Sequence, residues 1–191
     1  MNEIYLVRHG ETEWNVAGRF QGKLDSQLSN AGMLQADAIA TKLAERNFRA
    51  DAFVASPRGR TRHTASIIAS IVNLPNTQFD ERLAEVSLGS WDGLTHGDIH
   101  GRSPGSLDGS TPLDWFFRSP DGESYDAAVS RARNWLDSTA GRTLAVSHAL
   151  IGRIIRGAYL GLCRSETLSL PAPQDVIWRL SSGQIECIAS N

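Results

Sequence analysis

The sequence predicts an α/β fold, a three-layer sandwich in which helices cover both faces of a mostly parallel central sheet. Two observations carry this prediction. Short β-rich runs alternate with segments of helical periodicity from residue 3 to residue 161, and such alternation is typical of βαβ crossovers. The segment 175–189 instead holds two β-rich runs around Ser181, Ser182 and Gly183. This pattern predicts a C-terminal antiparallel hairpin at the edge of the sheet.

The first part of the chain supplies two strand–helix pairs. The run EIYLV at 3–7 is rich in β-forming residues and predicts the first strand. A helix is predicted over 29–46, because a helical period places on one face Met33, Ala36, Ala40 and Leu43. The run at 51–56 predicts the second strand, and 58–72 the second helix.

The second part continues the alternation after a long interruption. Residues 77–86 begin as a third strand and turn into a loop. Glycine and proline are frequent between 87 and 122, which predicts a long loop or small lid, and loops of this length in compact domains are usually functional or mobile. A helix is expected over 124–138, and a fourth strand over 142–147. A last helix, over 150–161, ends on Gly161, a favourable C-cap residue.

Length and composition limit what the chain can be. With 191 residues it is expected to form a single domain, 1–191, with a lid insertion at about 87–122. A net charge of −2 gives no indication of nucleic-acid binding. No run approaches about 18 apolar residues and no leader pattern opens the sequence, so we expect no membrane contact and a cytoplasmic location. Cys163 and Cys187 are expected to be reduced core residues.

Polar and charged side chains follow three of the predicted strands. Arg8 and His9 end the first strand, Ser56 ends the second, and His148 follows the fourth. In sheets of this class, ligands bind outside the carboxyl ends of the strands. The topology therefore predicts that two histidines and several arginines meet at one edge of the sheet.

This set of residues suits a phosphoryl group. Arg58, Arg60 and Arg62 lie at the predicted start of a helix, where cations oppose the helix dipole unless an anion lies among them. Arginine binds phosphate oxygens in a bidentate manner, and a neutral imidazole can attack phosphorus. Glu85 is the carboxylate nearest this edge, and a bound phosphate dianion would favour its protonated form, which suits a general acid. From the residues alone, a surface carboxylate is the simpler interpretation of Glu85.

Three other features of the sequence allow a structural as well as a functional interpretation. The stretch HGDIH places His96, Asp98 and His100 at alternate positions, but a metal site needs supporting residues that the sequence does not show, so no metal is expected. His63 is expected to be a structural or surface residue. The aromatic residues of DWFF either anchor the lid to the body or line the substrate mouth, and the sequence leaves this open for Trp115, Phe116 and Phe117.

Six segments, spread almost from end to end, resemble the histidine phosphatase superfamily in its phosphoglycerate mutase-like branch. They are RHGETEWN (8–15), GRFQGKLDSQLSNAGMLQA (18–36), SPRGRTRHTA (56–65), EVSLGSWDGL (85–94), DGES (121–124) and VSHALIGR (146–153). The resemblance implies the phosphoglycerate mutase-like fold and a reaction through a phosphohistidine.

The resemblance also implies roles for individual residues. His9 would accept the phosphoryl group, and Glu85 would act as the acid and base. The phosphate pocket would be formed by Arg8, Arg60 and His148, because the family's phosphate-binding arginine stands four residues after the serine of its motif. Further candidates for substrate or phosphate contacts are Thr12, Asn15, Gln21 and Gly22.

The chain departs from the family pattern at three positions. Ala149 and Leu150 stand where glycine usually follows the second histidine, and Leu88 replaces a common aromatic residue before Gly89. None of these changes removes a chemical group that the mechanism needs. We therefore expect them to affect substrate fit more than catalytic competence.

The expected function is hydrolysis of phosphomonoesters, independent of metal or other cofactors, with a small phosphorylated molecule as substrate. The first alternative is a cofactor-dependent phosphoglycerate mutase, and the second is a non-catalytic module that binds a phosphorylated ligand. Between 92 and 120 the only cations are Arg102 and Arg118, which favours a phosphatase over a mutase. The sequence leaves open the natural substrate and whether the chain forms a homodimer.

Overall fold

A six-stranded sheet forms the centre of the structure, a computed structural model that describes residues 2–111 and 114–190. In sheet order its strands are β3 (Gln78–Phe79), β2 (Ala52–Ala55), β4 (Arg142–Ser147), β1 (Glu3–Arg8), β5 (Val176–Ser181) and β6 (Gln184–Ala189). The first four are parallel, whereas β5 is antiparallel to β1 and β6 to β5. The predicted α/β class and the C-terminal hairpin are confirmed.

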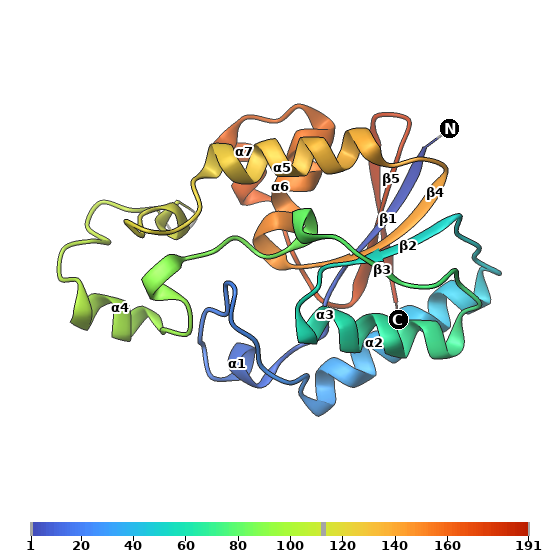
Figure 1. Ribbon diagram of the computed structural model, residues 1–191, viewed down its shortest axis with the longest axis horizontal. Helices are drawn as coiled ribbons and strands as arrows, with labels where there is room; N and C mark the ends of the chain where they lie inside the picture. The colour runs from blue at the N-terminus through green and yellow to red at the C-terminus, as the bar shows by residue number, and fades with distance from the viewer. Residues whose placement is uncertain (1, 112–113, 191) are drawn as a thin grey trace.

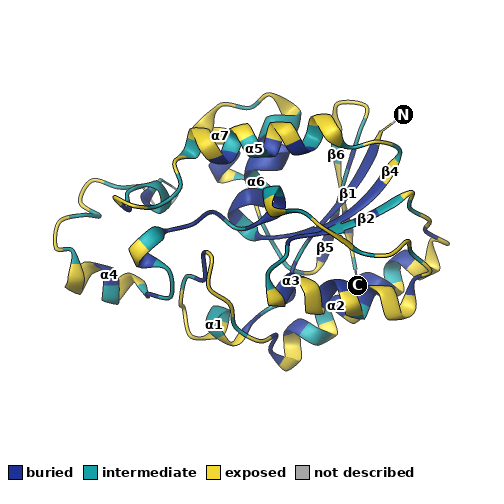
Figure 2. Cartoon of the chain, viewed as in Figure 1, coloured by how far each residue is buried: buried dark blue, intermediate teal, exposed yellow. Residues whose placement is uncertain are grey.

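Helices cover both faces of this sheet (Figure 1). On one face lie α2 (Asn30–Glu45) and α3 (Gly59–Ile71), and on the other α5 (Tyr125–Ser138), α6 (Ala149–Leu160) and α7 (Arg164–Ser169). Alternate side chains of a strand point to opposite faces. Along β1, Tyr5 and Val7 therefore pack in the α2–α3 core, while Ile4 and Leu6 pack in the α5–α6 core. Figure 2 shows this burial of the central strands.

The segment expected as a long loop or lid holds regular structure of its own. It contains α4 (His96–Arg102) and two 3-10 turns, Gly89–Trp91 and Trp115–Phe117. A separate small core is formed there by Leu88, Trp91, Leu94, Ile99 and Trp115. The helix α4 was not predicted because glycines interrupt its pattern, and the short helices α1 (Glu13–Val16) and α7 were not predicted either. In Figure 1, α4 projects away from the sheet.

The prediction that both cysteines belong to the core is wrong. Cys163 and Cys187 are free thiols, and both are exposed. Cys187 lies on the edge strand β6, where the next residue, Ile188, is the one that turns into the core. Cys163 stands just before α7 as its N-cap residue. Among the described residues, no helix is long and apolar enough to cross a membrane.

Two glycines allow the start of α2 to pack against the loop that follows β1. A Cβ atom added to Gly32 would lie 2.0 Å from the carbonyl oxygen of Glu11, and one added to Gly10 would lie 2.2 Å from the carbonyl oxygen of Gly32. Both contacts are with backbone, which cannot move aside as a side chain can. This close approach holds the backbone of Gly10 in place. Because His9 is the preceding residue, its position is restricted as well.

We predict that Gly32→Ala destabilises the protein by roughly 1–3 kcal/mol, because the added methyl group overlaps backbone atoms. The matched control is Gly101→Ala in α4, where an added Cβ has no neighbour within 4 Å. This control is expected to change stability by no more than about 1 kcal/mol, in the stabilising direction. The measurement is the free energy of unfolding in urea, and equal effects of the two substitutions would contradict the packing described here.

Candidate active site

His9 lies directly after β1, at the carboxyl edge of the sheet, and is 3% exposed. Its backbone N–H donates to the carbonyl oxygen of Ser147 at 2.9 Å, which ties it to the end of β4. Its ring nitrogen Nδ1 is 2.7 Å from the carbonyl oxygen of Gly10. A carbonyl oxygen can only accept a hydrogen bond, so we assign the proton to Nδ1. The lone pair of Nε2 is therefore available for a reaction.

His148 follows β4 and is joined to Arg60 and Ser56. Its Nδ1 accepts a hydrogen bond from Nε of Arg60 at 3.1 Å, and its Nε2 lies 2.7 Å from the hydroxyl oxygen of Ser56. Because a guanidinium can only donate, the proton of His148 is on Nε2. The rings of His9 and His148 are 5.2 Å apart between centroids. The three strand ends therefore meet as the topology predicts.

Both imidazoles are held in the neutral form. Burial lowers the pKa of His9 well below its usual range, and the positive charges of Arg8 and Arg60 lower it further. Burial and the charge of Arg60 lower the pKa of His148 in the same way. A neutral imidazole keeps the nitrogen lone pair that nucleophilic attack requires.

Arg60 is the arginine of α3 that reaches this site, as the family resemblance implies. Its terminal nitrogen atoms donate to the carbonyl oxygens of Leu24 at 2.7 Å and Gly22 at 3.1 Å, and it pairs with Asp25 at 3.0 Å. Arg58 instead pairs with Glu81 at 3.0 Å. Arg60 is therefore fixed from several sides before any ligand binds.

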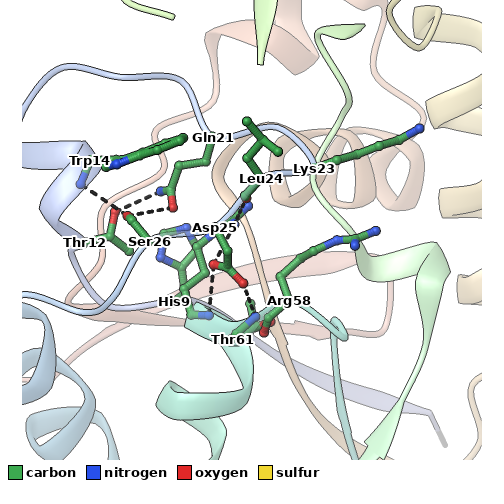
Figure 3. Close-up of polar contacts among 12 residues, drawn as sticks. His9, Thr12, Trp14, Gln21, Lys23, Leu24, Asp25, Ser26, Arg58 and Thr61 are labelled. Carbon is green, nitrogen blue, oxygen red and sulfur yellow. Dashed lines mark hydrogen bonds and ion pairs between the residues drawn. The ribbon is translucent and has the colours of Figure 1, made fainter. Parts of the chain in front are cut away.

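Asp25 supplies the anion that the start of α3 requires. Its carboxylate accepts hydrogen bonds from the backbone N–H groups of Gly59 and Arg60. This contact is the N-terminal cap of α3, because Arg58 in the N-cap position makes no side-chain capping bond. Figure 3 shows Asp25 next to Arg58 and Thr61 at this point. The arginines at the start of this helix predicted an anion here, and the carboxylate of Asp25, from a distant loop, is that anion.

Arg8 ends β1 and carries a charge that no carboxylate of the described residues pairs with. One terminal nitrogen donates to the carbonyl oxygen of Ala172 at 2.6 Å. Its Nε is buried and has no hydrogen-bond partner among the described residues. Burial lowers the pKa of Arg8 to about 10, so it remains charged at neutral pH. An unpartnered buried donor is costly unless a ligand satisfies it.

Glu85 lies opposite these cations, at the start of α6. Its two carboxylate oxygens accept hydrogen bonds from the backbone N–H groups of Leu150 at 3.1 Å and Ile151 at 3.0 Å. Arg131 holds the loop before it, donating at 2.7 Å to the carbonyl oxygen of Ala84. Glu85 is therefore held by the backbone of α6 at the cavity, in contrast to the surface loop carboxylate that is the simpler interpretation of the sequence.

A cavity of about 470 Å³ opens over this edge. The sequence-predicted residues that line it are Arg8, His9, Arg60, Glu85, Asn15, Gln21 and Gly22. His148 is buried and does not line this cavity. Thr12 is also buried, and its hydroxyl accepts from Nε2 of Gln21 at 2.9 Å (Figure 3). The same hydroxyl accepts from the backbone N–H of Asn15 at 3.2 Å. Thr12 therefore does not line the cavity itself, but it orients two residues that do, Gln21 and Asn15.

The lid aromatic residues divide between the two roles that the sequence left open. Phe116 lines the cavity. Trp115 is buried against the rings of Phe20 and His96, with centroids 4.5 and 4.3 Å away. Phe117 packs against Tyr125 instead. One aromatic residue of DWFF thus faces the cavity, and the other two anchor the lid.

The HGDIH stretch is the first part of α4 and does not gather its side chains at one point. His96 faces the cavity, while Asp98 caps the helix with Thr95 and pairs with Arg19. The described residues include no group of three or more His, Cys, Asp or Glu side chains placed to hold a metal ion.

Several residues of the cavity wall were not predicted from the sequence. Arg19, Phe20 and Arg153 line the cavity. All three stand inside segments that carry the family resemblance, 18–36 and 146–153, but their local patterns do not distinguish them from surface residues. Only the folded chain brings these segments to the same wall.

Comparison with known proteins identifies the family of the chain. The family model of the histidine phosphatase superfamily (branch 1) matches residues 4–181. The chain belongs to the histidine phosphatase superfamily. A relative from Escherichia coli O1:K1, named as a probable phosphoglycerate mutase GpmB, is 36% identical over 185 residues, covering 90% of this chain and 77% of the relative.

Solved structures place the chain beside phosphatases of this superfamily. A mycobacterial glucosyl-3-phosphoglycerate phosphatase, solved with VO3, superimposes with a TM-score of 0.76 at 27% identity, covering 99% of this chain and 97% of that protein. The α-ribazole phosphatase of Shigella flexneri has a TM-score of 0.84 at 23% identity, covering 99% and 96%. At 23% identity, the similarity to the α-ribazole phosphatase concerns the fold alone.

The three departures from the superfamily pattern all lie at the cavity. Ala149, Leu150 and Leu88 are lining residues. Their apolar side chains border the same cavity as Glu85 and Phe116 and leave the charged groups in place. This position agrees with an effect on substrate fit.

We predict that the ring of His9 remains neutral at pH 6 in the free protein. The pKa of His9 is lowered, so its ring takes up a proton only in a more acidic solution than an ordinary histidine, whose pKa is about 6.5. The measurement is a ¹⁵N NMR titration of the imidazole nitrogens, with His9→Gln to assign the signals. A titration midpoint at or above about 6.5 would contradict the electrostatic description of the site.

Proposed function

We propose that the protein hydrolyses phosphomonoesters through a phosphohistidine formed on His9. The observation that carries this proposal is the free Nε2 lone pair of His9 in a cavity wall shared with Arg8, Arg60 and Glu85. A binding module would need the arginines, but it would not need a nucleophile or an acid opposite it. This argues for an enzyme.

The reaction has two steps. In the first, Nε2 of His9 attacks phosphorus, the bond from phosphorus to the ester oxygen breaks, and Glu85 gives its proton to the leaving oxygen. In the second, Glu85 takes a proton from water while the water oxygen attacks phosphorus, and the P–N bond breaks to release phosphate. Arg8 and Arg60 offset the charge on the phosphoryl oxygens in both steps. His148 orients Arg60 through its Nδ1.

The relatives support two activities of the same superfamily. The solved glucosyl-3-phosphoglycerate phosphatase favours hydrolysis, and the relative named as a probable mutase favours phosphoryl return to the substrate. A phosphoglycerate mutase is therefore the second candidate function.

The surroundings of Glu85 favour hydrolysis. A mutase must keep water from the phosphohistidine, yet Glu85 also borders a second cavity of about 340 Å³ that is lined mainly by charged side chains. Such a polar cavity suits water. In the described lid, Arg118 donates to the carbonyl oxygens of Asp108 and Gly109 and does not line the main cavity. The lid instead contributes Phe116 and His96, which suit an aromatic or bulky leaving group.

We predict that phosphate release outruns isomerisation when 3-phosphoglycerate is supplied with a trace of 2,3-bisphosphoglycerate. Aryl phosphomonoesters should be hydrolysed faster than 3-phosphoglycerate. When a reaction with labelled substrate is quenched rapidly, the label should be found on His9. The variant His9→Ala should carry no label. Isomerisation that exceeds phosphate release by tenfold, about 1.4 kcal/mol in barrier height, would show a mutase instead. Label on another residue type would contradict the mechanism.

We predict that Glu85→Gln slows hydrolysis of alkyl phosphates by about 100-fold or more. The loss for 4-nitrophenyl phosphate should be much smaller, because this leaving group departs without a proton. The measurement is kcat for both substrates, and Glu45→Gln, an exposed residue of α2, serves as the control. Equal losses for the two substrates would mean that Glu85 is not the acid.

A further inference from the structure

Arg153 is a cation of the cavity wall that the proposed reaction does not use. Of the four arginines that line the cavity, Arg60 pairs with Asp25 and Arg19 pairs with Asp98. Arg8 belongs to the phosphate end beside His9. Arg153 makes no ion pair with any residue of 2–111 or 114–190, although it is partly buried. A half-buried guanidinium without an anion is unusual, because burial of an unpaired charge is unfavourable.

The Arg153 side chain is held in place through its inner nitrogen. Nε donates to the carbonyl oxygen of Leu170 at 2.6 Å. The next two carbonyl groups of the same segment bind other arginines, since Pro171 accepts from Arg156 and Ala172 from Arg8. The terminal nitrogens of Arg153 have no hydrogen-bond partner among the described residues, and the residue lines the cavity. Its planar donor face is therefore preorganised and free.

The place of Arg153 in α6 puts it on the leaving-group side of the site. It stands one helical turn after Ala149 and three residues after Leu150, and both also line the cavity. Burial lowers the pKa of Arg153, and the negative charge of Glu85, the acid for the leaving oxygen, partly opposes this shift. The substrate atoms beyond that oxygen would therefore lie between Arg153 and the apolar wall that includes Phe116 and Leu88.

We propose that Arg153 binds a carboxylate carried by the leaving group, so that the preferred substrates are aryl phosphates with an acidic substituent. This inference rests on the proposed phosphatase function. A planar guanidinium binds a carboxylate through two parallel hydrogen bonds, which a neutral amide of the same shape cannot match. The aromatic ring would lie along Phe116, while the phosphoryl group would occupy the end with Arg8, Arg60 and His9.

The test compares 3- and 4-carboxyphenyl phosphate with the matching carbamoylphenyl phosphates, which have nearly the same size and lack the charge. In the unaltered protein, kcat/KM for the better carboxylate should exceed that of its amide by at least about tenfold. Arg153→Gln should remove this preference and leave hydrolysis of the amides within about threefold. Arg153→Lys, which keeps the charge but not the paired donors, should retain part of the preference. Arg133→Gln, an exposed arginine of α5, is the matched control and should change nothing.

The outcomes separate this inference from the proposed function. Hydrolysis of all four compounds without a carboxylate preference would overturn the role of Arg153 and leave the phosphatase intact. Equal losses for carboxylates and amides in Arg153→Gln would show that Arg153 acts on the phosphoryl group, which also overturns the role. Phosphate release from none of the compounds would overturn both proposals. The comparison within the unaltered protein remains decisive if Arg153→Gln does not fold.

Discussion

The parallel pairing of β4 between β1 and β2 is the constraint on which the site depends. Backbone hydrogen bonds continue past the strand ends, from Ser56 to the carbonyl oxygen of Val146 and from His9 to that of Ser147, both at 2.9 Å. Because neighbouring parallel strands lie about 4.8 Å apart, this pairing brings residues from three distant parts of the chain into contact. The two histidines and the base of α3 then have fixed positions before any ligand binds.

The cations of the site are held largely by carbonyl oxygens. Three successive carbonyl groups, those of Leu170, Pro171 and Ala172, accept from Arg153, Arg156 and Arg8. A carbonyl group orients a guanidinium and leaves its positive charge in place. A carboxylate would also orient the guanidinium, but it would neutralise the charge. The protein thereby keeps a positive potential at the cavity while each arginine stays rigid. Burial and this potential keep both histidines neutral.

Asp25 and Glu85 show how helix ends organise the remaining groups. Asp25 caps α3 and pairs with Arg60, while Glu85 accepts from the first turn of α6. Each carboxylate is stabilised by backbone N–H groups at a helix N-terminus. Asp25 therefore helps to hold Arg60, a cation of the proposed phosphate end, and Glu85 is held where the proposed reaction places the leaving group. Two helices on opposite faces of the sheet contribute to one cavity in this way.

The sequence by itself determined the order of strands and helices, the hairpin, and the segments that end in Arg8, Ser56 and His148. These follow from local periodicity and from the rule that ligands bind at the carboxyl ends of parallel strands. It did not determine α4, the exposure of the cysteines, or the positions of Asp25, Phe116 and Arg153. Those depend on contacts between residues far apart in the chain, such as the 35 residues that separate Asp25 from Arg60. Only tertiary packing selects which of several similar side chains faces the cavity, because local patterns are the same for a wall residue and for its exposed neighbours.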